Sequence, residues 1–289
     1  MLWHWLVLYS FSFSVVSDRN PTSMTVIDFH THVFPKTLAP KALDALLANS
    51  AGHTNHTDGT LTGLIESMDL AGIGASVTLP VATKPEQVSS INRSIVSLQS
   101  DRIISFGALH PHLKDCASEC EYLRSNGIKG IKLHPEYQNF HVDDRLLFPL
   151  YEACCAANLI IVFHAGKDPG PFTSDHGLPA AFKKVIDTFP QLSIVLAHMG
   201  GLMVWDDVFN EIAGLGVYFD TSAVRNRMSP QEFIKLTHKH GIDRILFGSD
   251  SPWDDQRSCR LWIEEIGLST AHVEAVLGGN ALRLLTDLV

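Results

Sequence analysis

Short apolar runs rich in Val and Ile alternate with longer amphipathic segments from residue 24 to the end of the chain. Most of these runs are apolar at both odd and even positions, which is typical of strands buried on both faces of a parallel sheet. They predict strands at 25–30, 75–80, 102–108, 127–133, 159–164, 192–198, 217–221 and 244–248. The intervening segments repeat apolar residues at helical spacing. They predict helices at 61–71, 86–100, 115–125, 144–157, 179–189, 206–215, 230–240, 255–266 and 270–285.

Eight strands that alternate with helices predict an α/β protein built as a single (β/α)8 TIM barrel. Successive βαβ units are right-handed, and eight of them close a barrel of about 250 residues. An open doubly wound sheet would stop at about six strands and carry a glycine-rich phosphate turn after the first one. Here His30-Thr31-His32 follows the first strand instead. The irregular stretch 33–60 predicts an enlarged loop after strand 1, and no linker divides 24–289 into two domains.

Residues 1–23 form an apolar extension that precedes the first predicted strand. Its segment 1–16 contains no Lys or Arg. The segment is shorter than the roughly 18 residues of a spanning helix, and it lacks the basic region that opens a secretory signal. We therefore expect an extension that takes no part in the fold and a cytoplasmic protein. A signal peptide or a membrane anchor at 1–16 is the alternative.

Composition narrows the class of partner. The chain carries 31 Asp and Glu against 22 Lys and Arg, a formal net charge of −9. Nucleic acids and anionic membranes attract the opposite balance, so neither is expected as a partner. Five cysteines without a C-x-x-C pair indicate free thiols rather than a disulfide framework or a zinc ribbon. We expect a small-molecule substrate, and a homodimer only because dimers are the commonest homo-oligomers.

Histidines and an aspartate stand at the carboxyl ends of the predicted strands, where (β/α)8 enzymes carry their active sites. They are His30, His32, His164, His198 and Asp250. A single histidine is more often a hydrogen-bonded core residue than a ligand, and Asp250 could simply cap the next helix. Their accumulation at one end of the barrel nevertheless favours a metal site. Neutral imidazoles with an anionic oxygen suit one Zn²⁺, with Mn²⁺, Fe²⁺ or Co²⁺ as alternatives.

These segments resemble the amidohydrolase superfamily of metal-dependent barrels, and most of all its branch that includes aminocarboxymuconate-semialdehyde decarboxylase. The motifs that carry the resemblance occur in family order at 27–32, 130–136, 163–166, 197–201 and 248–253. The resemblance implies that one metal is held by His30, His32, His164 and Asp250. It also implies that His198 polarises water or substrate, or binds a second metal as in binuclear members.

Lys132 has two interpretations. Lys132, His134 and Glu136 share a face of the fourth predicted strand. Binuclear members of the superfamily bridge two metals at this place with a carboxylated lysine or a glutamate. The branch that this chain resembles is generally mononuclear, so we expect one metal and assign Lys132 to substrate binding, with a second metal at Lys132 as the less favoured alternative.

The same site suits two reactions. We expect hydrolysis of a small amide, lactam or lactone by a metal-activated water, with Asp250 taking the proton and His198 stabilising the oxyanion. The alternative is non-oxidative decarboxylation of an unsaturated or aromatic acid, in which Asp250 moves the proton. A barrel that binds a ligand without turnover is a third hypothesis, but it predicts a missing metal ligand and none is missing.

Four residues are predicted to contact the substrate: Lys132, His134, Arg225 and Trp253. Arg225, after the seventh predicted strand, is a candidate clamp for a carboxylate, and a solvated arginine is the alternative. Trp253, close to Asp250, either walls the pocket or packs in the core.

Overall fold

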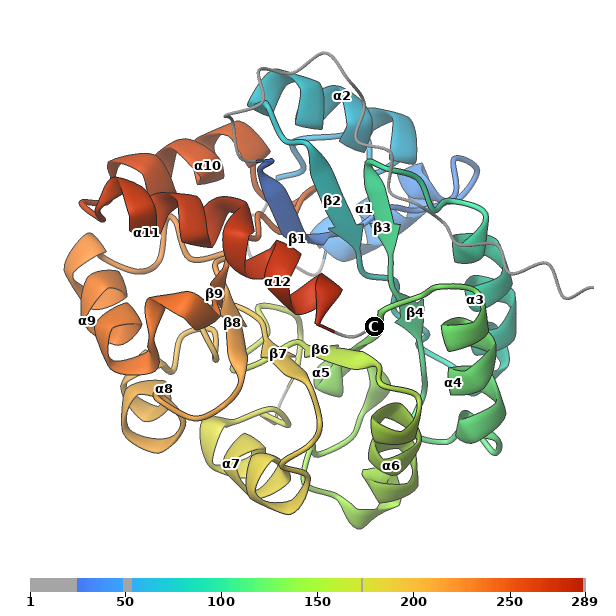
Figure 1. Ribbon diagram of the computed structural model, residues 1–289. Coiled ribbons are helices and arrows are strands. Elements are labelled where there is room, and N and C mark those ends of the chain that lie inside the picture. The colour runs from blue at the N-terminus through green and yellow to red at the C-terminus, as the bar shows by residue number, and fades with distance from the viewer. Residues whose placement is uncertain (1–24, 49–53, 173, 288–289) are drawn as a thin grey trace, which may run out of the picture.

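Short parallel strands form a ring whose outer face is covered by helices (Figure 1). This computed structural model describes residues 25–48, 54–172 and 174–287. Each strand predicted from the sequence overlaps at least one strand in this part of the chain. The strands are β1 (Ile27–Thr31), β2 (Ala75–Thr78), β3 (Ile103–Ser105), β4 (Gly107–Ala108), β5 (Gly130–Leu133), β6 (Ile160–Phe163), β7 (Ile194–Leu196), β8 (Tyr218–Asp220) and β9 (Ile245–Leu246).

The strands pair in parallel in chain order, as β1 to β3 and as β4 to β9. Strands β3 and β4 are two parts of the strand expected at 102–108, interrupted at Phe106, whose N–H donates to the Thr78 carbonyl at 3.0 Å. At the other junction the Phe29 N–H donates to the Phe247 carbonyl at 2.7 Å. A Cβ on Gly248 would lie 2.9 Å from the His30 Cβ, so this approach of β9 to β1 requires glycine. The predicted (β/α)8 barrel is confirmed.

Helices follow the strands and cover the barrel. They are α2 (Leu61–Ala71), α3 (Val88–Val96), α4 (Cys116–Ser125), α6 (Phe148–Ala156), α7 (Pro179–Thr188), α8 (Trp205–Glu211), α9 (Pro230–His240) and α10 (Gln256–Glu265). Two further helices, α1 (Ala39–Ala48) and the single turn α5 (Pro135–Gln138), lie in the loops after β1 and β5. Neither was predicted, and α1 makes the enlarged first loop partly helical. Short 3-10 turns occur at Pro85–Gln87, Arg145–Leu147 and Ile242–Arg244.

The helix expected at 270–285 is divided into α11 (Thr270–Glu274), a π-helical segment (Ala275–Gly279) and α12 (Asn280–Thr286). The π-helical segment passes very close to the chain before β1, since a Cβ on Gly278 would lie 2.1 Å from the Thr25 carbonyl oxygen. Beyond it, α12 crosses the barrel in Figure 1. Its Ala281 and Leu284 join an apolar cluster with side chains such as Phe29 from the strands. A second cluster fills the layer between strands and helices, so the strands are buried on both faces.

Two other expectations bear on the chain as a whole. The five cysteines carry free thiols, and Cys120, Cys154 and Cys259 are buried. Across the described ranges, no helix has the length and apolar character that crossing a bilayer demands. The extension 1–23 lies outside the described residues, so its role stays a prediction.

The buried histidine His240 makes stability depend on pH. Its Nε2 donates to the Val217 carbonyl at 2.9 Å, and its ring stacks on Phe219 with 3.7 Å between centroids. Burial lowers the pKa of His240 to about 4. The unfolded chain takes up this proton near pH 6.5, so stability is lost as the pH falls from 6.5 towards 4.

We expect His240 alone to account for about 2 kcal/mol of the stability lost between pH 7 and pH 5. Urea unfolding at both pH values should therefore show a loss that is smaller by this amount in the non-titrating variant His240→Gln. Equal losses in the wild-type protein and the variant would contradict the assignment.

Candidate active site and metal centre

A cavity of about 800 Å³ opens at the carboxyl ends of the strands, within the size range of small-molecule sites. Strands far apart in the sequence meet there because the carboxyl ends of parallel barrel strands lie on one face. Of the residues singled out in the sequence, the cavity is lined by His30, His32, Lys132, His134, His164, His198, Asp250 and Trp253.

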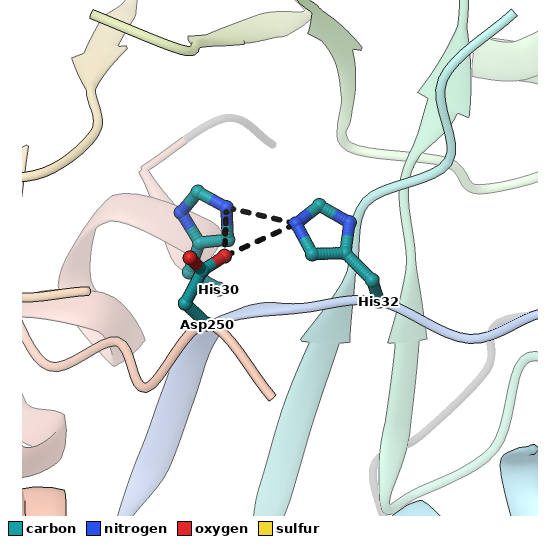
Figure 2. Close-up of side chains that lie close together, drawn as sticks. All are labelled: His30, His32 and Asp250. Atoms are coloured by element: carbon teal, nitrogen blue, oxygen red, sulfur yellow. Dashed lines mark hydrogen bonds and ion pairs between the residues drawn. The ribbon is translucent and has the colours of Figure 1, made fainter. Parts of the chain in front are cut away.

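Three of these side chains converge on one point (Figure 2). The Nε2 atoms of His30 and His32 are 3.2 Å apart. The Oδ1 atom of Asp250 lies 3.4 Å from the first of them and 3.3 Å from the second. We call these residues the ligand triad. Two imidazoles and a carboxylate form a donor set used by zinc and by the other first-row divalent metals.

A bulge in β1 helps to aim the two histidines. Asp28 pairs with Ser76 and Thr31 with Thr78, so β1 advances three residues while β2 advances two. Such a bulge bends a strand and redirects its side chains. Phe29 can thus belong to the barrel interior while the adjacent His30 also faces the cavity. Simple alternation of faces along a strand would place these two neighbours on opposite sides.

Hydrogen bonds decide which nitrogen of each triad histidine is free. The His30 Nδ1 donates to Asp220 Oδ2 at 2.8 Å, and the His32 Nδ1 donates to the Leu79 carbonyl at 2.8 Å. Carboxylate and carbonyl oxygens only accept, so each Nδ1 carries the proton and each Nε2 offers a lone pair. Two lone pairs and the Asp250 oxygen therefore face one another, an arrangement that a divalent cation would satisfy.

The protonation states of the triad also suit the binding of a divalent cation. Burial, with a further contribution from the Lys132 charge, lowers the pKa of His30 to about 4, so the ring is neutral near pH 7. Burial opposes ionisation of Asp250, but the neighbouring imidazoles of His30, His32 and His198 hold its pKa below the usual value. Metal coordination requires neutral histidine and ionised aspartate.

His198 and His164 form a second hydrogen-bonded chain in the cavity. The His198 Nδ1 donates to the Ser222 carbonyl at 3.1 Å, so its Nε2 accepts from the His164 Nδ1 at 3.0 Å. This leaves a buried lone pair on His164 Nε2, which has no hydrogen-bond partner among the described residues. The nitrogen lies 3.8 Å from Asp168 Oδ2. The donor atom of His164 therefore clusters with those of His134 and Asp168, while its expected place among the metal ligands stays a prediction.

Lys132 lines the cavity, whereas Glu136 does not, although the sequence predicts both on one face of a strand. Lys132 is buried, and its Nζ lies 3.4 Å from His30 Nε2. Burial lowers the pKa of Lys132 to about 8. Glu136 does not line the cavity, since the chain leaves the strand after Leu133 and enters α5. Its carboxylate accepts instead from the backbone N–H and the Nδ1 of His176.

Arg225, the arginine expected to contact the substrate, lies away from the cavity, and a neighbouring arginine lines it. Arg225 does not line the cavity, because its guanidinium pairs with Asp254 at 2.7 Å. Arg227 lines the cavity instead. Strand parity could not have separated them, since residues two apart share a strand face and this segment is in any case a turn.

Two aspartates of the candidate site, Asp220 and Asp168, were not singled out in the sequence analysis. Asp220 stands at the carboxyl end of β8, so the strand-end rule that selected the histidines would have found it. Asp168 lies in a loop, 3.4 Å from His134 Nε2, and nothing in the local pattern distinguishes it. Burial raises the pKa of Asp168 to about 6.

Asp220 is expected to be a positioning residue for the metal. The isosteric change Asp220→Asn removes the anion that orients the His30 ring, and should weaken metal affinity by about 10- to 100-fold. Competition with a chromophoric chelator measures this dissociation constant. Asp254→Asn is the control, because it is the same change at another buried aspartate, which pairs with Arg225 and does not line the cavity. Equal effects of both variants would contradict the role of Asp220.

Comparison with known proteins identifies the family of this chain. A family model described as amidohydrolase matches residues 27–286. A curated relative, 2-amino-3-carboxymuconate-6-semialdehyde decarboxylase from Dictyostelium discoideum, is 27% identical over 229 residues, which cover 66% of this chain. The match spans 63% of the length of that relative.

Solved structures share the fold. An uncharacterised TIM-barrel protein from Bordetella bronchiseptica superposes with a TM-score of 0.73 at 21% identity, over 92% of this chain and 99% of the other. A dihydroxybenzoic acid decarboxylase from Polaromonas, with bound manganese and the inhibitor 2-nitroresorcinol, gives 0.65 at 20% identity, over 91% and 97%. Because the family model covers nearly the whole barrel, the chain belongs to the amidohydrolase family.

Proposed function

We propose that this protein is a metal-dependent, non-oxidative decarboxylase of a small unsaturated or aromatic carboxylic acid. The observation that carries the proposal is the buried ammonium of Lys132 beside the ligand triad, which suits an anionic substrate. The similarity to a decarboxylase, and a fold shared with another, support it further. These comparisons favour the alternative of the sequence analysis over hydrolysis of an amide or lactone.

We assign His30, His32 and Asp250 as the metal ligands. The unpartnered Nε2 of His164 is the remaining histidine donor in the cavity, as the sequence analysis proposed. A divalent cation, Zn²⁺ or Mn²⁺, would supply Lewis acidity to a substrate oxygen when bound. His198 would then act through His164, because both of its ring nitrogens are engaged in hydrogen bonds.

Two carboxylates line the cavity, and they would take different roles. Decarboxylation replaces the carboxylate of the substrate by a proton and releases carbon dioxide. Asp250 belongs to the ligand triad, so Asp168, 3.4 Å from His134, is the carboxylate that remains to deliver the proton. Lys132 would hold the substrate carboxylate, and Trp253 would form part of the wall.

The test uses full-length protein purified without chelator, with metal counted per chain by elemental analysis. It is incubated in D2O with a panel of hydroxybenzoic and unsaturated acids, and in parallel with lactones and amides. The expected result is release of carbon dioxide, with one deuterium at the carbon that lost its carboxylate. Hydrolysis of a lactone or amide without any decarboxylation would overturn the proposal.

A further inference from the structure

The cavity continues well beyond the ligand triad. Its lining extends without interruption from the barrel mouth, past Leu79 and Val81 after β2, to the surface of α3. A compact acid would fill only the polar end of the cavity, beside the ligand triad. The apolar part of the cavity along α3 would then be left without a ligand, so we ask which ligand fits it.

One face of α3 lines this apolar part of the cavity. The lining residues recur at a spacing of three and four: Gln87 in the 3-10 turn before α3, Ser90, Ile91, Ser94 and Ile95 in α3, and Leu98 just after it. At 1.5 Å per residue, the wall between the first and the last is about 16 Å long. The space thus runs along the helix and does not merely touch its end. We call it the α3 groove.

The α3 groove is apolar on the inside and open to solvent at its rim. Ile95 is buried and Ile91 and Leu98 are half-buried, whereas the rim residues of the same face are exposed. The apolar lining of the same cavity also includes Leu46 of α1 and Leu38 just before it, the latter 55% exposed.

The polar residues Gln87 and Ser90 at the rim of the groove do not require a polar ligand. The Ser90 hydroxyl donates to the Gln87 carbonyl at 2.9 Å, and the Gln87 side-chain oxygen accepts from the Thr83 hydroxyl at 3.1 Å. The Ser90 hydroxyl and this Gln87 oxygen are therefore satisfied within the protein, and the rest of the rim, including Ser94, is exposed to solvent. An apolar chain could lie on the isoleucines beneath them without leaving a buried polar group unpaired.

We propose that the substrate is a carboxylic acid with an extended apolar substituent, which lies in the α3 groove while the acid group lies at the ligand triad. The inference rests on the proposed function and deepens it by naming the substrate class. Its support is the continuity of the groove with the triad and Lys132 in one cavity. Burial of methylene groups along about 16 Å of apolar wall would then dominate affinity and select long substituents over short ones.

The test measures binding, so that it does not depend on turnover. The Mn²⁺-loaded full chain is titrated by calorimetry with resorcinol and with 5-alkylresorcinols of increasing chain length, as analogues of a decarboxylated product. We expect affinity to rise by about two- to fourfold for each added methylene. Affinity that does not change with chain length would overturn the inference.

Two serine-to-tryptophan variants of α3 place the effect in the groove. Ser94 is exposed on the groove face, and Ser89 is exposed on the same helix but outside the lining. Ser94→Trp should reduce affinity for the longest ligand at least about tenfold and leave that for resorcinol unchanged. Ser89→Trp should change neither. Equal effects of the two variants would overturn the inference.

Other outcomes separate the two proposals. A change of oligomeric state in Ser94→Trp, without any change in ligand affinity, would make the groove an interface between copies and overturn the inference. Affinity that rises with chain length, in a protein that decarboxylates none of the acids, would support the groove as a ligand site and overturn the decarboxylase. Decarboxylation of unsubstituted acids, together with an affinity that does not change with chain length, would support the decarboxylase and overturn the groove as a ligand site.

Discussion

Asp250→Asn is expected to abolish metal retention and to lower turnover by about 1000-fold or more. Asp250 supplies the anionic donor of the ligand triad, 3.3–3.4 Å from the two histidine nitrogens. The amide has nearly the same shape but no charge, so it binds a divalent cation far more weakly. Elemental analysis after gel filtration measures the retained metal, and a decarboxylation assay measures turnover.

Asp254→Asn is the matched control for this change. Asp254 lies four residues further on and pairs with Arg225, away from the cavity lining. It should keep its metal and most of its turnover. A metal content in Asp250→Asn equal to that of the wild-type protein would contradict the assignment of the triad.

Lys132→Met is expected to lower kcat/KM for the acid by about 100-fold, mainly through KM, with the metal content unchanged. The side chain is buried, so its charge acts on a bound carboxylate with little screening by solvent. Methionine fills a similar volume without the charge. Steady-state kinetics and elemental analysis on the same preparation give both quantities.

Lys36→Met provides the comparison, because Lys36 also lines the cavity but is exposed. Solvent screens its charge, so kcat/KM should change by less than about fivefold. Two metal ions per chain in the wild-type protein, reduced to one in Lys132→Met, would instead make Lys132 a ligand of a second metal. That result would contradict a mononuclear site.

The barrel and most of the lining of its site could be predicted from local pattern alone. Strands covered on both faces are apolar at every position, and this signature recurs eight times between amphipathic helices. Parallel strands then bring their carboxyl ends to one face, whatever the loops do. For this reason His30, His164, His198 and Asp250, widely separated in the sequence, were expected in one cavity and lie there.

The direction of a side chain beyond a strand end could not be predicted in this way. Glu136 shares the strand face of Lys132, but α5 carries it to His176. Arg225 is held by Asp254, which leaves Arg227 at the cavity. In each case the partner is remote in sequence, so no periodicity within the segment contains it.

The sequence by itself therefore determined the number and order of the βα units and the chemistry gathered at their ends, because these follow from short-range periodicity. Only the tertiary structure decided which of these side chains form the ligand triad, which form other contacts in the cavity, and which lie outside it. The β1 bulge and the acceptors on Asp220 and Leu79 aim the lone pairs of the triad. Residues of α1 and α3, which are distant in sequence, line the same cavity and so shape the groove. These arrangements depend on contacts between distant segments, which form only when the barrel is closed.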